Sequence, residues 1–139
     1  MIKAEMSRQL MIRVDDRVGT LAEVTTFISS SGINQIAICA YEANGVVAMM
    51  FVTEDNNAAK NILEQHHFQV QEEEVILLTI DNKPGALQRI TDKIASAGIN
   101  LRLMYGSVAK ESQYGRIVIL SDNNLDVMMV IKTELERRE

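Results

Sequence analysis

The sequence repeats itself, and this repeat limits the folds that are open to the chain. Moving the sequence by 66 residues places DDRVGTLAEVTTFISSSGIN (15–34) on DNKPGALQRITDKIASAGIN (81–100) without a gap. We then insert one residue, so that VTEDNN from residue 52 falls on ILSDNN from residue 119. Each copy is long enough for a complete supersecondary unit, so we expect one domain over 1–72 and a second over 73–139. The identical positions include Asp15 and Asp81, Gly19 and Gly85, Leu21 and Leu87, Ile28 and Ile94, Gly32 and Gly98, Ile33 and Ile99, and Asn34 and Asn100.

Each copy has a pattern of strands and helices that predicts an α+β fold. The runs LMIRV (10–14) and EVILLTI (74–80) are short, apolar and rich in branched residues, which predicts strands. Apolar residues at helical spacing follow each run, and Gly32 and Gly98 stand where a left-handed helix cap belongs. Each copy continues with two strand-like runs around a turn and with a second helix that begins at asparagine.

The order of these elements is that of a ferredoxin-like sandwich. A last short strand, FQVQ (68–71), completes the order βαββαβ in the first copy. We therefore expect antiparallel sheets with helices on one face. The second copy ends within a few residues of its helix, so its last strand should be missing or vestigial. The edge that this would leave open is a candidate contact surface.

Composition excludes several classes of protein. The 14 basic and 19 acidic residues give a net charge of -5, which disfavours a nucleic acid or an anionic membrane as partner. The single cysteine, Cys39, cannot form an internal disulfide. The start MIKAEMSRQL lacks the apolar core of a signal peptide, and no apolar run is long enough to span a membrane. We expect a cytoplasmic protein.

The sequence gives little support for catalysis, for a metal or for a cofactor. The adjacent His66 and His67 point about 100° apart on a helix, so they do not form a pair of metal ligands. Cys39 lies in the apolar run IAICAY, with no base nearby in the sequence. No phosphate-binding loop of the Walker type is present. An RNA-binding sheet would need stacking aromatics and a basic surface, and the chain has only three Tyr and three Phe. We therefore expect no enzyme activity.

The repeated motifs resemble those of the ACT domain, a small regulatory fold of amino-acid enzymes. In both copies a strand leads to a polar residue three before a glycine (DRVG, NKPG), to a helix with leucine two after that glycine, and to a closing GIN. The chain thus looks like a free-standing tandem ACT protein. The resemblance implies that it binds a free amino acid or a similar small carboxylate and regulates a separate metabolic enzyme or transporter.

The loop before the second copy's first helix has features of a carboxylate site. We expect Pro84 in the first helical turn, where its missing N–H costs nothing, and Gly85 can let a ligand approach the backbone. The amides of Gly85, Ala86 and Leu87 would then be free donors at a helix N-terminus. Asn82 could bind both charged groups of an amino acid. The alternative is that NKPG is only a good strand-to-helix turn.

The resemblance also implies how two sites would be built from paired domains. It places Asn82 and the amides of 85–87 opposite Asn34 in one site. The other site would have Asp16 and Gly19, Thr20 and Leu21 opposite Asn100. An ionised Asp16 would repel a ligand carboxylate, so we expect the Asn82 site to be the better one. Asn34 and Asn100 can also be explained as turn residues after the cap glycine.

Several strands are apolar on both faces, among them VVAMMFV, VILLTI and RIVIL. Either the two repeats cover these faces within one chain or a second chain does, and we favour a homodimer because ACT domains usually pair side by side. Two functions stay open. The chain is an amino-acid sensor, or it is a protein interaction module whose ACT-like sites bind no ligand.

Overall fold

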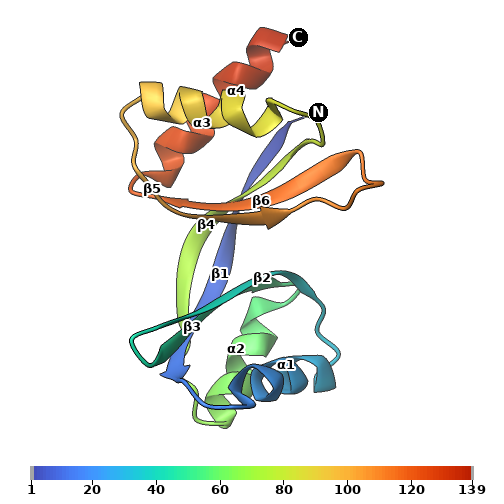
Figure 1. Ribbon diagram of the computed structural model, residues 1–139, viewed down its shortest axis with the longest axis vertical. Helices are drawn as coiled ribbons and strands as arrows, with labels where there is room; N and C mark the ends of the chain where they lie inside the picture. Colours follow the sequence, from blue (N-terminus) through green and yellow to red (C-terminus); the bar gives the residue numbers. More distant parts are fainter. Residues whose placement is uncertain (1, 139) are drawn as a thin grey trace. The chain divides into compact units, whose positions relative to one another are not determined.

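The computed structural model describes the backbone of residues 2–138 and the side chains of residues 2–135, and it confirms the predicted α+β fold. Strands and helices follow the predicted order except at one place (Figure 1). The predicted separate strand FQVQ (68–71) is wrong, because residues 68–70 belong to no strand and a single strand, Gln71–Asp81, runs across the predicted domain boundary. No helix in the described part of the chain combines the length and the apolar composition needed to cross a membrane. The elements are β1 (Lys3–Asp15), α1 (Thr20–Ser30), β2 (Gln35–Ala43), β3 (Val46–Thr53), α2 (Asn56–Gln65), β4 (Gln71–Asp81), α3 (Ala86–Ser96), β5 (Leu101–Ser107), β6 (Tyr114–Ser121) and α4 (Asn124–Arg138).

The chain divides into two compact units. The central unit is Arg8–Glu73, and the terminal unit consists of the described residues on either side of this segment. The repeats predict a boundary between residues 72 and 73, next to the observed one between Glu73 and Glu74. They do not predict the other boundary, between Ser7 and Arg8. As a result, β1 and β4 each contribute residues to both units.

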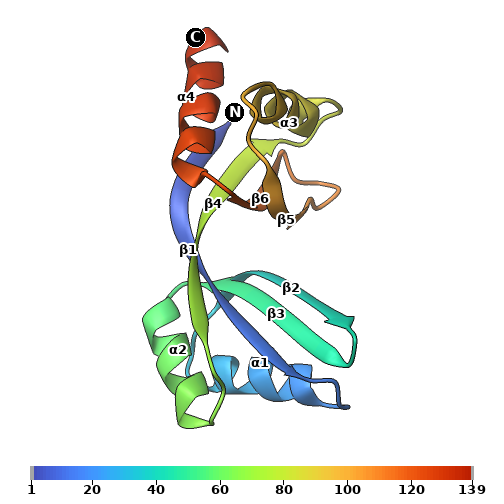
Figure 2. The same ribbon diagram turned by 90° about the vertical axis from the view of Figure 1, so that its left-hand side faces the viewer.

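In the central unit, two helices cover one face of the sheet formed by β2, β3 and β1. Both strand pairs are antiparallel, with Leu10 opposite Phe51 between β1 and β3. Alternate residues of β1 and β3 meet apolar residues of α1 and α2 in one core. The remaining face of the sheet carries no helix of this unit (Figure 2). The fully buried core residues are Leu10, Ile12, Val24, Ile28, Met49, Phe51, Ala59 and Leu63.

In the terminal unit, the same arrangement is completed by the start of the chain. No strand follows α4 among the described residues, as the sequence predicts. The place beside β4 is nevertheless filled by β1 (Figures 1 and 2), and Ile2 and Ala4 pack against the core of this unit. The expected open edge is therefore wrong. Pairing with β1 satisfies backbone groups that an open edge would leave to water.

One asparagine makes the same side-chain hydrogen bonds in both copies and so shows how the two copies align. Asn56 Oδ1 accepts hydrogen bonds from the backbone N (3.0 Å) and Oγ1 (2.8 Å) of Thr53. Asn124 makes the same two bonds to Ser121, both at 2.9 Å. These pairs are 68 residues apart, so two residues are inserted in the second copy and the expected single insertion is wrong. The extra residues lie in the longer connection between β5 and β6.

We expect Asn56→Ala to lower the free energy of unfolding by about 2 kcal/mol, because the substitution leaves partly buried groups of Thr53 without a partner. It also removes the bond from Asn56 Nδ2 to the carbonyl of Arg8 (2.8 Å). Urea denaturation measures this change. The adjacent Asn57 is exposed, so Asn57→Ala is the control and should change stability by less than about 0.5 kcal/mol. Equal losses in the two variants would contradict this role.

Candidate functional site

The turn between strand and first helix has the same geometry in both units. Thr20 N donates to Arg17 O (3.4 Å), and Ala86 N donates to Lys83 O (3.2 Å). The glycine before each helix has a positive φ, 94° at Gly19 and 86° at Gly85, with ψ near zero. These are the angles of the third position of a type II turn, where glycine is favoured.

Pro84 therefore lies in a turn and not in the first turn of a helix. It occupies the second position of the type II turn, where proline is also common. Helix α3 begins only at Ala86. The predicted position of Pro84 is wrong because the left-handed Gly85 separates it from the helix.

The first helical turn of each unit presents backbone donors, but the predicted free amide of Ala86 is wrong, because it donates to Lys83 O within the turn. In α1 the first helical hydrogen bond runs from Glu23 N to Gly19 O (2.9 Å). The amides of Leu21 and Ala22 come before it and have no acceptor among the described residues. In α3 the corresponding first bond runs from Arg89 N to Gly85 O (3.2 Å). Such amides favour a negatively charged ligand group.

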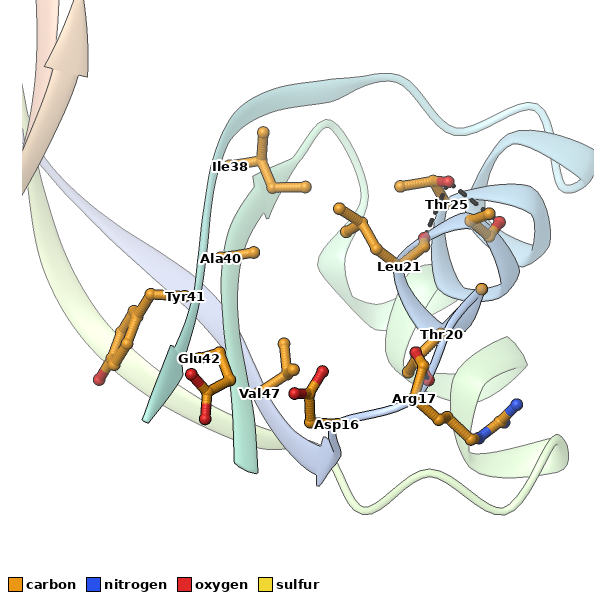
Figure 3. A pocket seen from close by; sticks show the side chains of 12 residues that line it. Asp16, Arg17, Thr20, Leu21, Thr25, Ile38, Ala40, Tyr41, Glu42 and Val47 are labelled. Carbon is orange, nitrogen blue, oxygen red and sulfur yellow. Dashed lines mark hydrogen bonds between the residues drawn. The ribbon is translucent and has the colours of Figure 1, made fainter. Parts of the chain in front are cut away.

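In the central unit these amides border a cleft of about 710 Å³. The cleft lies between the start of α1 and strand β2 (Figure 3). It contains four predicted ligand-binding residues: Asp16, Gly19, Thr20 and Leu21. The remaining lining residues, which the sequence analysis did not identify as ligand-binding, are Arg17, Ala22, Thr25, Ile38, Ala40, Tyr41, Glu42 and Val47.

One wall of the cleft is apolar. Leu21 points from α1 toward Ile38 and Ala40 on β2 (Figure 3). Leu21 and Ile38 are 46% and 45% exposed, although both are large aliphatic residues. The two helices cover β1 and β3 but leave this side of β2 open. An apolar ligand group could therefore bury these side chains.

Acidic side chains form a second part of the lining. Asp16 and Glu42 lie near each other beside Val47 (Figure 3). Glu42 Oε1 accepts a hydrogen bond from Gly45 N (2.8 Å), whereas the Asp16 carboxylate has no partner among the described residues. Arg17 does not neutralise them, because its side chain points away and pairs with Glu23 (2.9 Å). The cleft thus combines free amides, carboxylates and an apolar wall.

The corresponding part of the terminal unit is built differently. Asn82 Nδ2 donates to Ser112 O (2.8 Å) and to Ala109 O (3.4 Å), so its amide holds the connection between β5 and β6. Neither interpretation of NKPG predicted this role, since both concerned the loop itself and not a distant connection. Leu87 is partly buried against the core, unlike its counterpart Leu21.

Two further counterparts of cleft residues contact each other in the terminal unit. Val108 corresponds to Glu42, and Gly115 corresponds to Val47. A Cβ added to Gly115 would lie 2.4 Å from Val108 Cγ2, so the two residues are closely packed. The acidic Glu42 and the aliphatic Val47 of the central cleft are thus replaced by a closely packed pair.

Asn34 and Asn100 lie in the turns after the first helices. The carbonyl of Asn34 accepts from Glu54 N (3.0 Å), and that of Asn100 accepts from Asp122 N (3.1 Å). Both residues are exposed, and Asn34 does not line the cleft. These bonds fit the interpretation as turn residues. Their predicted place opposite the other repeat stays a prediction.

The second half of the chain matches a known family. Residues 76–137 match the AHAS small subunit-like ACT domain. No curated protein sequence matches the chain. Among solved structures, protein BT0572 from Bacteroides thetaiotaomicron is 26% identical, with a TM-score of 0.88 over 94% of this chain and 90% of that one.

Regulatory proteins share the fold over nearly the whole chain. The ligand-free regulatory subunit of aspartate kinase from Thermus thermophilus has a TM-score of 0.67 at 14% identity, covering 96% of both chains. The corresponding subunit from Thermus flavus has the same TM-score at 15% identity, covering 95% of both. At these identities the comparison is evidence for a common fold.

Proposed function

We propose that this protein is a regulatory amino-acid sensor and that its ligand binds in the cleft of the central unit. The observation that carries the proposal is the joint lining of one cleft by free amides and carboxylates. The amides of Leu21 and Ala22 donate hydrogen bonds to the ligand's carboxylate. Asp16 and Glu42 lie where they can bind its ammonium group.

The apolar wall favours a ligand with an aliphatic side chain. Leu21, Ile38 and Ala40 offer a surface that such a group would bury at about 25 cal/mol per Å². An acidic side chain would meet the two carboxylates that already line the cleft and would be disfavoured. This proposal assigns Asp16 a favourable role, as partner of the ammonium group. It therefore places the better site in the central unit, whereas the sequence analysis favoured the Asn82 loop.

The regulated partner would be a separate metabolic enzyme or transporter. Ligand binding would fix the turn of 16–19 against β2 and so change the surface around it. We also propose a homodimer, supported by the edge strand β2 and its half-exposed Ile38 and Tyr41. Sedimentation velocity would check the assembly state.

The alternative function is a protein interaction module without a small ligand. The same half-exposed apolar side chains would then serve a protein contact. A thermal-shift screen of the 20 amino acids separates the two, since a ligand that binds only the folded state raises the melting temperature. We expect a shift with at least one aliphatic amino acid. If no amino acid raises the melting temperature at millimolar concentration, the protein is an interaction module and not an amino-acid sensor.

We expect Asp16→Asn to weaken binding of the best ligand by about tenfold, because a hydrogen bond to a charged group contributes about 1.5–3 kcal/mol. Asp15→Asn is the matched control, since the adjacent carboxylate does not line the cleft. Isothermal titration of both variants measures the change. An unchanged affinity in Asp16→Asn would contradict the role of Asp16.

A further inference from the structure

A second hollow of the central unit gathers basic side chains. It has a volume of about 620 Å³ and lies between the end of β1, Val46 and the segment that follows α2. Arg13, Arg17 and His67 line it together with the amide side chain of Gln69. Asp15 is the only carboxylate in its lining. Basic side chains thus gather in this hollow although the whole chain has a net charge of -5.

The two arginines retain donors for a ligand. Arg13 makes no ion pair and no side-chain hydrogen bond among the described residues. Arg17 uses Nη2 for Glu23, which leaves the other nitrogens of its guanidinium. Its side chain points away from Asp16 and Glu42 (Figure 3), and the residue lines this second hollow as well as the cleft. Guanidinium groups bind the oxygens of phosphate in pairs, which makes them well suited to a tetrahedral oxyanion.

The segment that carries the other donors is held in place. His67 has a φ of 68°, which is a left-handed conformation. Gly32 has the same conformation at the equivalent position after helix α1. Its amide donates to Glu64 O (3.0 Å), and the next amide, of Phe68, donates to Leu63 O (3.1 Å). A histidine in this conformation costs about 1–2 kcal/mol relative to a right-handed one. The hollow therefore contains a strained histidine at a position where glycine would adopt the same backbone conformation without this cost.

A smaller hollow of about 160 Å³ shares part of this lining. Met11 and Gln71 line it, and Arg13 and Gln69 belong to both hollows. Arg13 therefore lies where a ligand in the larger hollow could extend along β1 into the smaller one. The space suits a ligand that carries more than a bare anion.

We propose that this basic hollow binds the phosphate group of a small phosphorylated metabolite. Arg13 and Arg17 bind the phosphate oxygens, and His67 and Gln69 supply further donors. The proposal is independent of the amino-acid site, because it uses other donors and can be tested without an amino acid. Arg17 nevertheless stands in the loop that carries Asp16 and Gly19, so the same turn contributes to both sites.

Titration of the intact protein with inorganic phosphate and, separately, with glycerol 3-phosphate tests the proposal. Backbone amide NMR at constant ionic strength, kept with sodium chloride, follows the binding. We expect saturable shifts at residues 67–69, with tighter binding of glycerol 3-phosphate if the ligand is an organic phosphate and equal binding if it is free phosphate. No saturable shift with either compound would overturn the proposal.

Two variants make the test specific. Arg13→Gln should weaken binding by about tenfold, since it removes a charge-assisted hydrogen bond, while the exposed Arg116→Gln in the terminal unit should not change it. His67→Gly should raise the melting temperature, because it removes the left-handed histidine, and still bind phosphate severalfold more weakly. A loss of affinity in a more stable protein cannot come from unfolding. Unchanged affinity in Arg13→Gln and His67→Gly would overturn the proposal.

Discussion

Replacing Ile2 with alanine is expected to lower the free energy of unfolding by about 3 kcal/mol, as for other large-to-small changes in a core. Ile2 is only 6% exposed and belongs to the apolar cluster of the terminal unit, with Ile76, Leu78 and Ile131. The start of β1 supplies the strand that the second repeat lacks after α4. Losing the Ile2 side chain leaves a cavity and weakens the docking of this strand.

Guanidinium denaturation measures the loss, and amide hydrogen exchange locates it. Exchange should rise in the terminal unit, at β4 and α3, more than in β2 and β3 of the central unit. Lys3→Ala is the control, because Lys3 is exposed in the same strand. If Ile2→Ala were no less stable than Lys3→Ala, the start of the chain would not complete the terminal unit.

Replacing Ala40 with phenylalanine is expected to weaken amino-acid binding by about a hundredfold, because overpacking costs about 1–3 kcal/mol. Ala40 lies in the middle of the cleft wall, opposite Leu21 (Figure 3). Its side chain is exposed, so a larger ring can enter the cleft without disturbing the core. Isothermal titration with the best amino acid from the screen measures the effect.

Ala43→Phe is the matched control for this substitution. Ala43 is an exposed alanine of the same strand, and its side chain points to the other face of β2, because neighbours alternate along a strand. Both variants should keep the stability of the unchanged protein within about 0.5 kcal/mol. Equal affinities in the two variants would show that the ligand binds elsewhere.

The helices and most strands could be predicted because their signals are local. Gly32 and Gly98 both have a φ of 74°, which confirms the predicted left-handed caps. The start of β1 was not predicted, although Ile2, Ala4 and Met6 alternate with polar residues, because its neighbour β4 lies far away in the sequence. Long-range pairing of this kind leaves almost no trace in a single sequence.

The alignment of the repeats shows a second limit of sequence reasoning. Each second helix begins near two adjacent asparagines, so an insertion of one residue and an insertion of two both match an asparagine with an asparagine. Only the side-chain bonds of Asn56 to Thr53 and of Asn124 to Ser121 decide between them. The difference matters because it identifies Gly115, and not Tyr114, as the counterpart of Val47.

The site was predictable in part. The glycine turn and the free amides of the first helix follow from local sequence. The lining residues Ile38, Ala40 and Glu42 were not predicted, although their spacing along β2 places them on one face. Whether that face is covered depends on how the helices sit on the sheet. The role of Asn82 depends in turn on the length of a distant loop, to whose carbonyls it donates.

Amide NMR of the isotopically labelled protein, titrated with each aliphatic amino acid, tests the central claim most directly. The account predicts saturable shifts at Leu21 and Ala22, whose amides receive the carboxylate, and at Ile38 and Ala40 across the cleft. The counterparts Leu87 and Gln88 in the terminal unit should shift much less. Saturable shifts confined to residues 82–88, or no shift with any amino acid, would contradict an amino-acid site in the central unit.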